Sequence, residues 1–468
     1  MAGTEPKSGF LSKLTGMIEE ALPRHIGDLP HVRLAFEDTL AVIFAGWCEP
    51  VTRKTIDLYA GGNNASPDTL SAPNAEDEAL ILGTAAHALD FDDVHQTSST
   101  HPSAPIVAAL MAATRRHPQW RERVATAFSI GLAVNVALGR VLGFPHYEKG
   151  WHATSTIGPL AATAACAYLM GLDAERSAAA LAIAAAQAGG LQRNFGAMAK
   201  PLQAGLAAAA GLRAARLAGA GVTADEDVFG PKGYFDLYGG AEPGEDAGAI
   251  TFDPAQSGIA VKLYPCCYQT HRPIAAALSA RRELQEKNIP LAQLDTIEIL
   301  GPAGAFLPLR VLHPRTGSEG KFCGAYTVAC ALVDGEVGLG HFEDDAMRRP
   351  DLRAVMNRTR FIEREGKPDG MKRRSDPLDL IARDAAGNEV VRTSVIPAPG
   401  SPDSPPTPEQ IQAKVKDCLA FYQRKSGAVF EYGRFQTMIG QILSAPHPAA
   451  SGVAPSAAPS AAFPAAGD

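Results

Sequence analysis

Between residues 11 and 217 the chain is a succession of apolar, alanine-rich segments whose hydrophobic positions recur with helical spacing. This spacing predicts helices, and the alternation typical of strands is nearly absent from this part of the sequence. Breakers such as Pro50, Pro73, Pro118 and Pro145 separate the segments. We therefore expect an all-α domain with helices at 11–22, 32–47, 54–59, 75–89, 104–116, 120–142, 156–170, 174–188 and 201–217.

The pattern changes near residue 265. Alternating and β-branched residues predict strands at 294–301, 360–366, 376–384 and 388–396. Helices are expected among them at 272–285 and 326–332. After a proline-rich stretch, Thr407-Pro408-Glu409 is typical of a helix start, and two more helices are predicted at 409–424 and 434–443.

Together these segments predict a mainly α fold. We expect a large helical domain (1–265), a smaller α+β lid domain (266–404) and C-terminal helices that return to the helical domain (405–445). The tail, 446–468, consists mostly of Pro, Ala, Ser and Gly and is predicted to be disordered, and residues 1 to about 10 are expected to be loose.

Composition excludes several classes of partner. A chain of 468 residues with 46% hydrophobic and 20% charged residues is typical of a soluble globular protein of two domains. The net charge of −7 argues against nucleic acid. Seven scattered cysteines, an odd number without CxxC spacing, favour a reduced, cytoplasmic chain without a zinc site. No apolar run reaches the roughly 18 residues of a membrane span, so no membrane partner is expected.

The most unusual stretch is HALDFDDVHQTSSTHPS, from His87 to Ser103, which places three carboxylates and three imidazoles between two apolar helices. Acidic residues at the C-terminal end of a helix are unfavourable for stability. Ser103 is expected to cap the next helix. The cluster predicts the floor of an active site, although Asp92, Asp93 and His95 taken singly favour capping or structural roles.

Further polar residues accompany apolar helices. His152 precedes one, where the alternative is an N-cap cluster, and Lys200 lies at a helix start suited to an anion, where the alternative is a solvated lysine. Tyr326 lies on an apolar helix and is alternatively a core tyrosine. At the predicted domain boundary stand Lys262, Tyr264, His271 and Arg272. This inventory suits acid–base chemistry on a small polycarboxylate.

Several blocks in order resemble the MmgE/PrpD family, which includes 2-methylcitrate dehydratases, cis-aconitate decarboxylases and iminodisuccinate epimerases. The blocks are HALDFDDVH with THPSAP, GWHATSTIGPLAATAA, NFGAMAKPLQAG, GPKGYFD, VKLYPCCYQTHR and AYTVACALVDG. The resemblance covers about 15–445 and implies a helical domain with an α+β lid, a homodimer, and no cofactor or metal.

The resemblance to the decarboxylase branch also implies roles for single residues. Matched active-site positions are Asp90, His101, His152, Lys200, Lys262 and Tyr326. His101 is expected to carry the proton, and Lys200 and Lys262 to hold substrate carboxylates. Several positions depart from the family pattern. Val94 stands where many relatives have Thr, the loop before His101 is one residue longer than in the animal decarboxylases, Gln203 stands where His is frequent, and Cys267 replaces a histidine of that branch.

Our leading hypothesis is a cofactor-independent lyase of the 2-methylcitrate dehydratase type. We predict as catalytic residues His101, Asp90, His152, Lys200 and Tyr326, and as substrate-binding residues Lys262, His271 and Arg272. Decarboxylation of cis-aconitate or epimerisation of iminodisuccinate would need the same groups. More distant alternatives are a magnesium-dependent all-α synthase using Asp92-Asp93, which lacks a further carboxylate because Gln96 stands there, and an inactive scaffold dimer.

Overall fold

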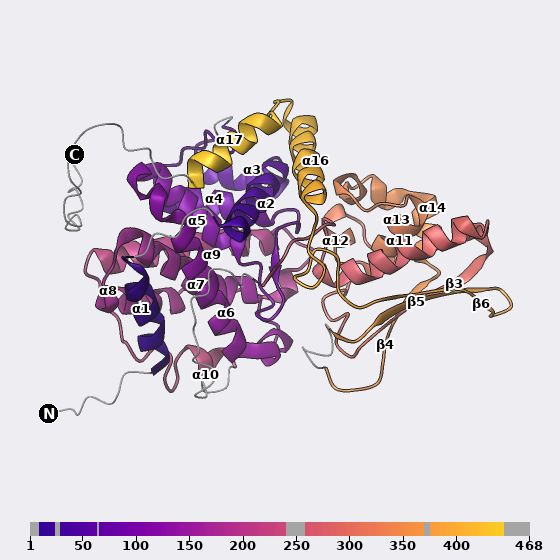
Figure 1. Cartoon of the computed structure of the whole chain (residues 1–468), viewed down its shortest axis with the longest axis horizontal. Coiled ribbons are helices and arrows are strands. Elements are labelled where there is room, and N and C mark those ends of the chain that lie inside the picture. Colours follow the sequence, from indigo (N-terminus) through magenta and orange to yellow (C-terminus); the bar gives the residue numbers. More distant parts are fainter. Residues whose placement is uncertain (1–8, 24–28, 63–64, 240–257, 369–374, 444–468) are drawn as a thin grey trace.

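The computed structural model describes residues 9–23, 29–62, 65–239, 258–368 and 375–443. The prediction of a mainly α architecture is confirmed. Figure 1 shows a helical body, which contains both the early and the last helices, and beside it a smaller part that contains a sheet. The predicted disordered tail, 446–468, and residues 1–8 lie outside the described residues, whereas Gly9, expected to be loose, already begins a helix.

Alanine and glycine dominate the contacts of the helical body, because they let helix backbones approach closely. α9 passes between α4 and α7: a Cβ on Gly205 would meet Thr84 and the Leu80 carbonyl, and one on Gly211 would meet Ala162. The principal helices are α1 (Gly9–Ala21), α2 (Pro30–Gly46), α3 (Pro50–Tyr59), α4 (Ala75–His87), α5 (Ser103–Arg116), α6 (Val124–Glu148), α7 (Ala153–Met170), α8 (Ala174–Ala185), α9 (Ala199–Gly219) and the short α10 (Tyr234–Tyr238).

The smaller part contains a sheet of order β4-β3-β5-β6, in which β3 pairs parallel with β4 and antiparallel with β5. A separate core joins Ile297, Ile299 and Leu380 of the sheet to Ile274 and Val328 of its helices. The elements are α11 (His271–Glu286), β3 (Leu294–Gly301), α12 (Gly317–Gly320), α13 (Gly324–Val333), α14 (Pro350–Met356), β4 (Thr359–Glu363), β5 (Leu378–Asp384) and β6 (Glu389–Val395). Each lies where a strand or helix was predicted, apart from α12 and α14, and β4 is shorter than expected.

The chain then re-enters the helical body through α16 (Pro408–Ser426) and α17 (Tyr432–Leu443). Thr407 and Gln410 form a capping box at the start of α16, as the Thr-Pro-Glu sequence suggested. Phe44 of α2 packs against Tyr422 and Phe435, so both helices share the core of the body.

One local expectation agrees with the structure and one is wrong. The range of α6 contains two helical stretches that meet at a kink at Gly143, whose backbone is non-helical, with a φ of 58° that glycine adopts at little cost, so the first stretch ends close to the predicted residue 142. Ser103 is not the N-cap of α5 but its first residue, and its hydroxyl contacts Asp93 instead.

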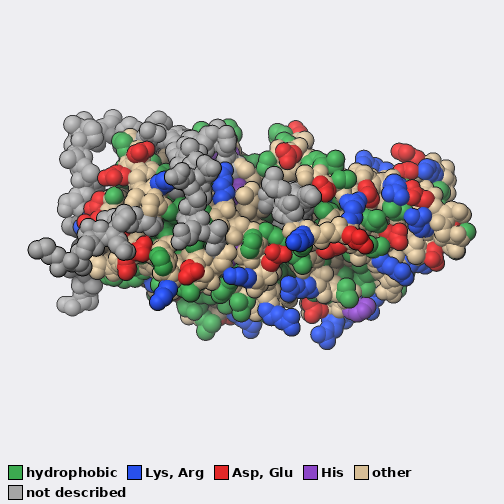
Figure 2. Space-filling view, turned by 90° about the horizontal axis from the view of Figure 1, so that it is seen from below, with side chains coloured by type: hydrophobic (Ala, Val, Ile, Leu, Met, Phe, Trp, Pro, Cys, Tyr) green, Lys and Arg blue, Asp and Glu red, His purple; other side chains and the backbone are tan. Residues whose placement is uncertain are grey.

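The stretch Pro118–Glu148 is long and apolar enough to cross a membrane by composition, contrary to the sequence-based expectation, but 72% of its apolar window is buried inside the protein. Core helices of soluble proteins have the same property. On the face in Figure 2, positive and negative side chains are interspersed over the smaller part instead of gathering by sign.

Candidate active site

A cavity of about 300 Å³ lies between the helical body and the smaller part. The body contributes Asp90, His101, His152, Phe195 and Lys200, and the smaller part contributes Cys267, Arg272, Phe322 and the segment 396–398. The short strands β1 (Val94–His95) and β2 (Ile259–Ala260) pair beside it. Ligand sites are frequent at such boundaries.

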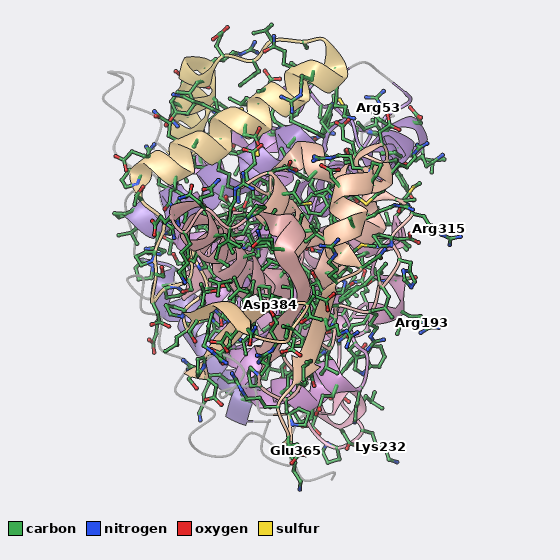
Figure 3. All side chains as sticks on the ribbon, turned by 90° about the vertical axis from the view of Figure 1, so that its right-hand side faces the viewer. Arg53, Arg193, Lys232, Arg315, Glu365 and Asp384 are labelled. Carbon is green, nitrogen blue, oxygen red and sulfur yellow. The ribbon has the colours of Figure 1, made fainter. Side chains whose placement is uncertain are left out.

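Helices α5, α7, α9 and α11 all begin at this cavity. His152 is the N-cap residue of α7, Lys200 and Arg272 are the second residues of α9 and α11, and His101 lies two residues before α5. A helix N-terminus carries partial positive charge and exposed N–H groups. The cavity therefore suits an anion. The exposed cations labelled in Figure 3, such as Arg193 and Arg315, lie instead at the outer edge of the molecule.

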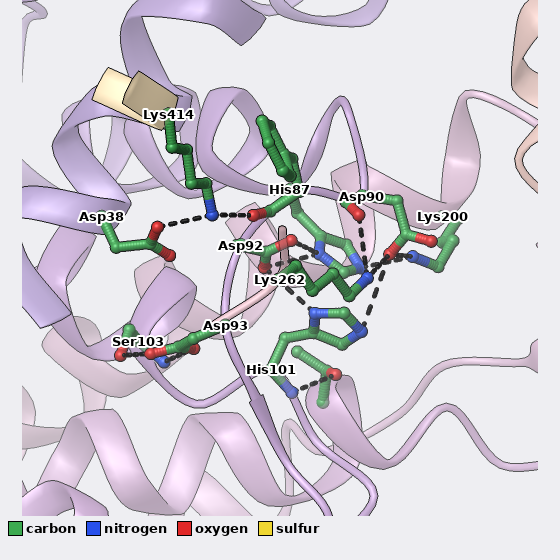
Figure 4. Close-up of polar contacts among 12 residues, drawn as sticks. Asp38, His87, Asp90, Asp92, Asp93, His101, Ser103, Lys200, Lys262 and Lys414 are labelled. Atoms are coloured by element: carbon green, nitrogen blue, oxygen red, sulfur yellow. Dashed lines mark hydrogen bonds and ion pairs between the residues drawn. The ribbon is translucent and has the colours of Figure 1, made fainter. Parts of the chain in front are cut away.

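Asp90 is the charge centre of the site (Figure 4). Its Oδ1 accepts hydrogen bonds from Lys200 Nζ at 2.8 Å and Lys262 Nζ at 2.9 Å. Burial alone would raise the pKa of Asp90, but Lys200, Lys262 and His101 hold it well below its usual range. The carboxylate is therefore charged at neutral pH, and it neutralises lysines that would otherwise be buried without a counter-charge.

Lys262 does not line the cavity. Its side chain is fully buried, and its ammonium also donates to the Asp90 backbone carbonyl at 2.8 Å. Burial lowers the pKa of Lys262, but the nearby charges of Asp90 and Asp92 outweigh this effect, so the pKa of Lys262 is raised overall. Lys200 is thus the lysine that can meet a substrate carboxylate, and Lys262 supports it from behind Asp90.

His87 links Lys200 to Asp92, a role that the sequence reasoning missed. Lys200 Nζ lies 2.9 Å from His87 Nε2, and His87 Nδ1 lies 2.8 Å from Asp92 Oδ2. Because an ammonium only donates, Nε2 accepts and Nδ1 carries the hydrogen that bonds Asp92. The only sequence signal was the position of His87 at the end of α4, five residues before Asp92.

His101 lies between the two carboxylates. Its Nδ1 is 3.4 Å from Asp92 Oδ2 and its Nε2 is 3.7 Å from Asp90 Oδ1. Its backbone N–H donates to Thr154 Oγ1 at 3.0 Å, which fixes the entry into α5. Burial lowers the pKa of His101 to about 4, against the opposing effect of Asp92, so the ring is neutral at neutral pH.

The His152 ring is held by Gln203 and His87. Its Nδ1 lies 2.7 Å from Gln203 Oε1, and its ring stacks on His87 with centroids 5.6 Å apart. Next to it, Phe195 and Phe322 stack at 5.4 Å, and the Lys200 ammonium lies 5.4 and 5.3 Å from their centroids. These rings join the body to the smaller part and shield the ammonium from water.

Besides Lys262, two further predicted site residues do not line the cavity. The Tyr326 hydroxyl donates to the His341 carbonyl at 2.6 Å inside the smaller core, as the core-tyrosine alternative stated. His271 is buried between the rings of Tyr264 and Tyr268, 5.1 and 5.0 Å away. Arg272 does line the cavity, while its guanidinium also donates to the Asp376 carbonyl at 2.8 Å.

A metal fits this cluster poorly. His87, Asp90, Asp92 and His101 offer ligand atoms within 4.8 Å of one another. However, lysine ammonium groups already bond His87 Nε2 and Asp90 Oδ1, and two adjacent positive charges oppose a cation. Asp93, the second half of the possible magnesium motif, bonds Ser103 instead, and burial raises its pKa to about 8.

Comparison with known proteins gave two family matches. The model of the MmgE/PrpD N-terminal domain matches residues 20–245, and that of the MmgE/PrpD C-terminal domain matches residues 264–429.

Among curated relatives, a cis-aconitate decarboxylase of Homo sapiens is 28% identical over 306 residues, which cover 63% of this chain and 62% of that protein. A cis-aconitate decarboxylase of Mus musculus is 26% identical over 74% of each chain. The cis-aconitate decarboxylase-like protein oryM of Aspergillus oryzae is 25% identical over 78% of each.

Proposed function

Because the chain belongs to the MmgE/PrpD family, we propose that it is a cofactor-independent lyase acting on a small di- or tricarboxylate. The observation that carries the proposal is the cavity itself: helix N-termini, Lys200 and Arg272 face the same space as the neutral imidazoles of His101 and His152. The positive groups match substrate carboxylates, and the imidazoles can exchange protons with a carbon beside them.

The chemistry begins with a weakly acidic proton next to a carboxylate. When a base removes that proton, negative charge develops on the carboxylate, and Lys200 and the helix N-termini offset it. One such donor contributes about 3 kcal/mol in other enzymes. In dehydration the C–H electron pair forms the double bond as the C–O bond breaks, and an acid protonates the departing hydroxide to water. Asp90 accepts a hydrogen bond from Lys200 and positions it, in contrast to the acid–base role expected for Asp90 from the sequence.

Dehydration of the 2-methylcitrate type is our leading reaction, because two imidazoles supply both a base and an acid. Decarboxylation of cis-aconitate is the second candidate, favoured by the names of the relatives. Both reactions act on a three-carboxylate skeleton, and both need a proton exchanged at carbon. Epimerisation of iminodisuccinate needs only proton removal and return.

A proton-exchange screen in deuterated water tests the proposal. The full chain is incubated with citrate, 2-methylcitrate, cis-aconitate or iminodisuccinate, and NMR follows deuterium at carbon while loss of water or carbon dioxide is measured separately. We expect carbon-bound deuterium from at least one substrate, unaffected by a chelator. Absence of exchange with all of them refutes the proposal, and loss of activity with chelator favours the magnesium-dependent alternative.

A lysine pair provides the matched control. Lys200→Met removes the ammonium at similar length and should abolish most exchange. Lys287→Met removes an exposed lysine paired with Glu283 on α11 and should change nothing. Equal loss in both variants would contradict a specific role for Lys200.

We also propose, from the family resemblance, that the protein is a cytoplasmic homodimer. Candidates for the dimer interface are three apolar side chains that are exposed on the helical body, Leu191, Met198 and Leu206. Light scattering of the purified chain distinguishes a dimer from a monomer.

A further inference from the structure

We propose that Gln203 is a positioning residue that fixes the tautomer of His152, so that His152 Nε2 is the base that takes the substrate proton and His101 is the acid. This inference rests on the proposed function and deepens it, since sequence resemblance pointed to His101 as proton carrier and to His152 only as its support.

The first step is the direction of the hydrogen bond. Gln203 Oε1 lies 2.7 Å from His152 Nδ1, while the amide nitrogen of Gln203 donates to the Leu191 carbonyl at 3.4 Å. This second contact assigns the oxygen to the histidine side. Because an amide oxygen only accepts, His152 Nδ1 must carry the hydrogen, and Nε2 keeps its lone pair.

The second step is how firmly the pair is held. Gly190 has a φ of +135°, and a Cβ there would lie 2.7 Å from Ser155 Cβ and 2.9 Å from Gln203 Oε1. The Gly190 carbonyl also accepts the His152 backbone N–H at 3.0 Å, and Ser155 Oγ donates to the Gln203 carbonyl at 3.1 Å. Any side chain at position 190 would displace the Gln203 amide, so only glycine at this position leaves room for the amide beside His152.

The third step is the free nitrogen. His152 lines the cavity, and its buried Nε2 has no hydrogen-bond partner among the described residues. The titratable groups that face the ring are His87, Lys200 and His101, and the neutral amide of Gln203 completes its surroundings. Burial, followed by His87 and Lys200, holds the pKa of His152 well below its usual range. The ring is therefore neutral with an unpartnered lone pair, so Nε2 can accept a proton. The lowered pKa makes it a weaker base than free imidazole and lets it return the proton readily.

His101 has the opposite surroundings. Asp92 and Asp90 lie 3.4 and 3.7 Å from its two ring nitrogens, so carboxylates stabilise its protonated form once a proton is delivered. Two titratable groups whose environments differ in this way divide the acid and base roles.

The proton balance follows. The substrate C–H bond breaks, its proton goes to His152 Nε2, and the resulting imidazolium keeps its Nδ1–H bond to Gln203. The electron pair forms the carbon–carbon double bond as hydroxide leaves. The hydroxide takes a proton that His101, neutral in the free protein, has first accepted from solvent and holds between the carboxylates of Asp90 and Asp92. Water is formed, and His101 is neutral again.

Substitutions at position 203 test the assignment kinetically, with whichever substrate the exchange screen identifies. Gln203→Met keeps the length and removes the acceptor, and it should lower kcat at least about tenfold, with a smaller change in KM. Gln203→Glu keeps the acceptor and adds charge. It should retain most turnover and move the acid limb of kcat/KM to higher pH, because a carboxylate stabilises the imidazolium. Gln285→Glu, an exposed change on α11, serves as the control.

A glutamine with only a structural role would not give both a lower kcat in Gln203→Met and a shifted acid limb with retained turnover in Gln203→Glu. Wild-type kcat in Gln203→Met, or an unshifted acid limb in Gln203→Glu, overturns the inference. Thermal unfolding checks that each variant is folded, and the Glu variant keeps the test open if the Met variant is not.

An independent readout does not need substrate. In protein labelled with ¹⁵N-histidine, the His152 signals, identified by their loss in His152→Asn, should show hydrogen on Nδ1, and Gln203→Met should lose this preference. Hydrogen on Nε2 in the wild type overturns the inference. If the exchange screen finds no activity, the proposed function fails, and the NMR result still decides the tautomer.

Discussion

Asp90→Asn removes the negative charge that buried Lys200 and Lys262 share while keeping the size of the side chain. Both ammonium groups lie within 2.9 Å of the same carboxylate oxygen, and both lysines are at least nine-tenths buried. Removing one partner of a buried pair costs about 3–5 kcal/mol, because the other charge stays desolvated. Lys262 retains the Asp90 backbone carbonyl, so we expect a loss in this range and not its double.

Thermal and urea unfolding measure this loss. At about 2 °C per kcal/mol for a long chain, Tm should fall by roughly 6–10 °C at neutral pH. The folded-state pKa of Asp90 is depressed, so the carboxylate stabilises the protein above its unfolded pKa of about 4, and this contribution is lost as pH falls through the folded pKa. The difference between wild type and variant should therefore be largest at neutral pH and shrink in acid.

Two further variants complete the test. The double variant Asp90→Asn with Lys262→Met removes the carboxylate charge together with one of the two ammonium charges that it faces. It should therefore be more stable than Asp90→Asn alone. Asp295→Asn, at an exposed position in β3, should change the free energy of unfolding by less than about 0.5 kcal/mol. If Asp90→Asn is as stable as the wild type at neutral pH, Asp90 is not the counter-charge of the lysines, and the electrostatic account of the site is refuted.

Other predictions concern buried groups near and away from the cavity. Burial raises the pKa of Asp93 to about 8, so the folded protein holds a proton that the unfolded chain releases near pH 4. The free energy of unfolding should therefore fall as pH rises from about 4 to about 8. Asp93→Asn should flatten this slope when unfolding is measured across the same pH range. Tyr326→Phe should cost about 1 kcal/mol through the lost bond to His341 and leave kcat unchanged, and a large drop in kcat would return Tyr326 to the active site. Gly190→Ala should lower both Tm and kcat, because the new Cβ meets Ser155 and Gln203, and a fully active variant would contradict the packing around His152.

Local patterns were sufficient for much of the fold. The alternation of apolar residues predicted β3, β5 and β6 to within a few residues of their observed ends. Thr407 predicted the start of α16, where it forms a capping box with Gln410. Such features depend on neighbours in sequence, so periodicity and capping chemistry reveal them. Where a distant contact competed, the prediction was wrong: Asp93 bonds Ser103, ten residues on, and Ser103 is no longer the cap.

The sequence by itself predicted that polar groups would gather between apolar helices. Asp90, His101, His152 and Lys200 stand beside expected helix ends, and the family resemblance selected them as active-site positions. Only the tertiary structure decided how they pair. Lys200 and Lys262 reach Asp90 across 110 and 172 residues, His87 bridges Lys200 to Asp92, and Gln203 faces His152, while Tyr326 turns into the smaller core. The physical reason is that helical spacing specifies which face of a helix is buried, whereas hydrogen-bond partners and tautomers depend on which helix packs against that face.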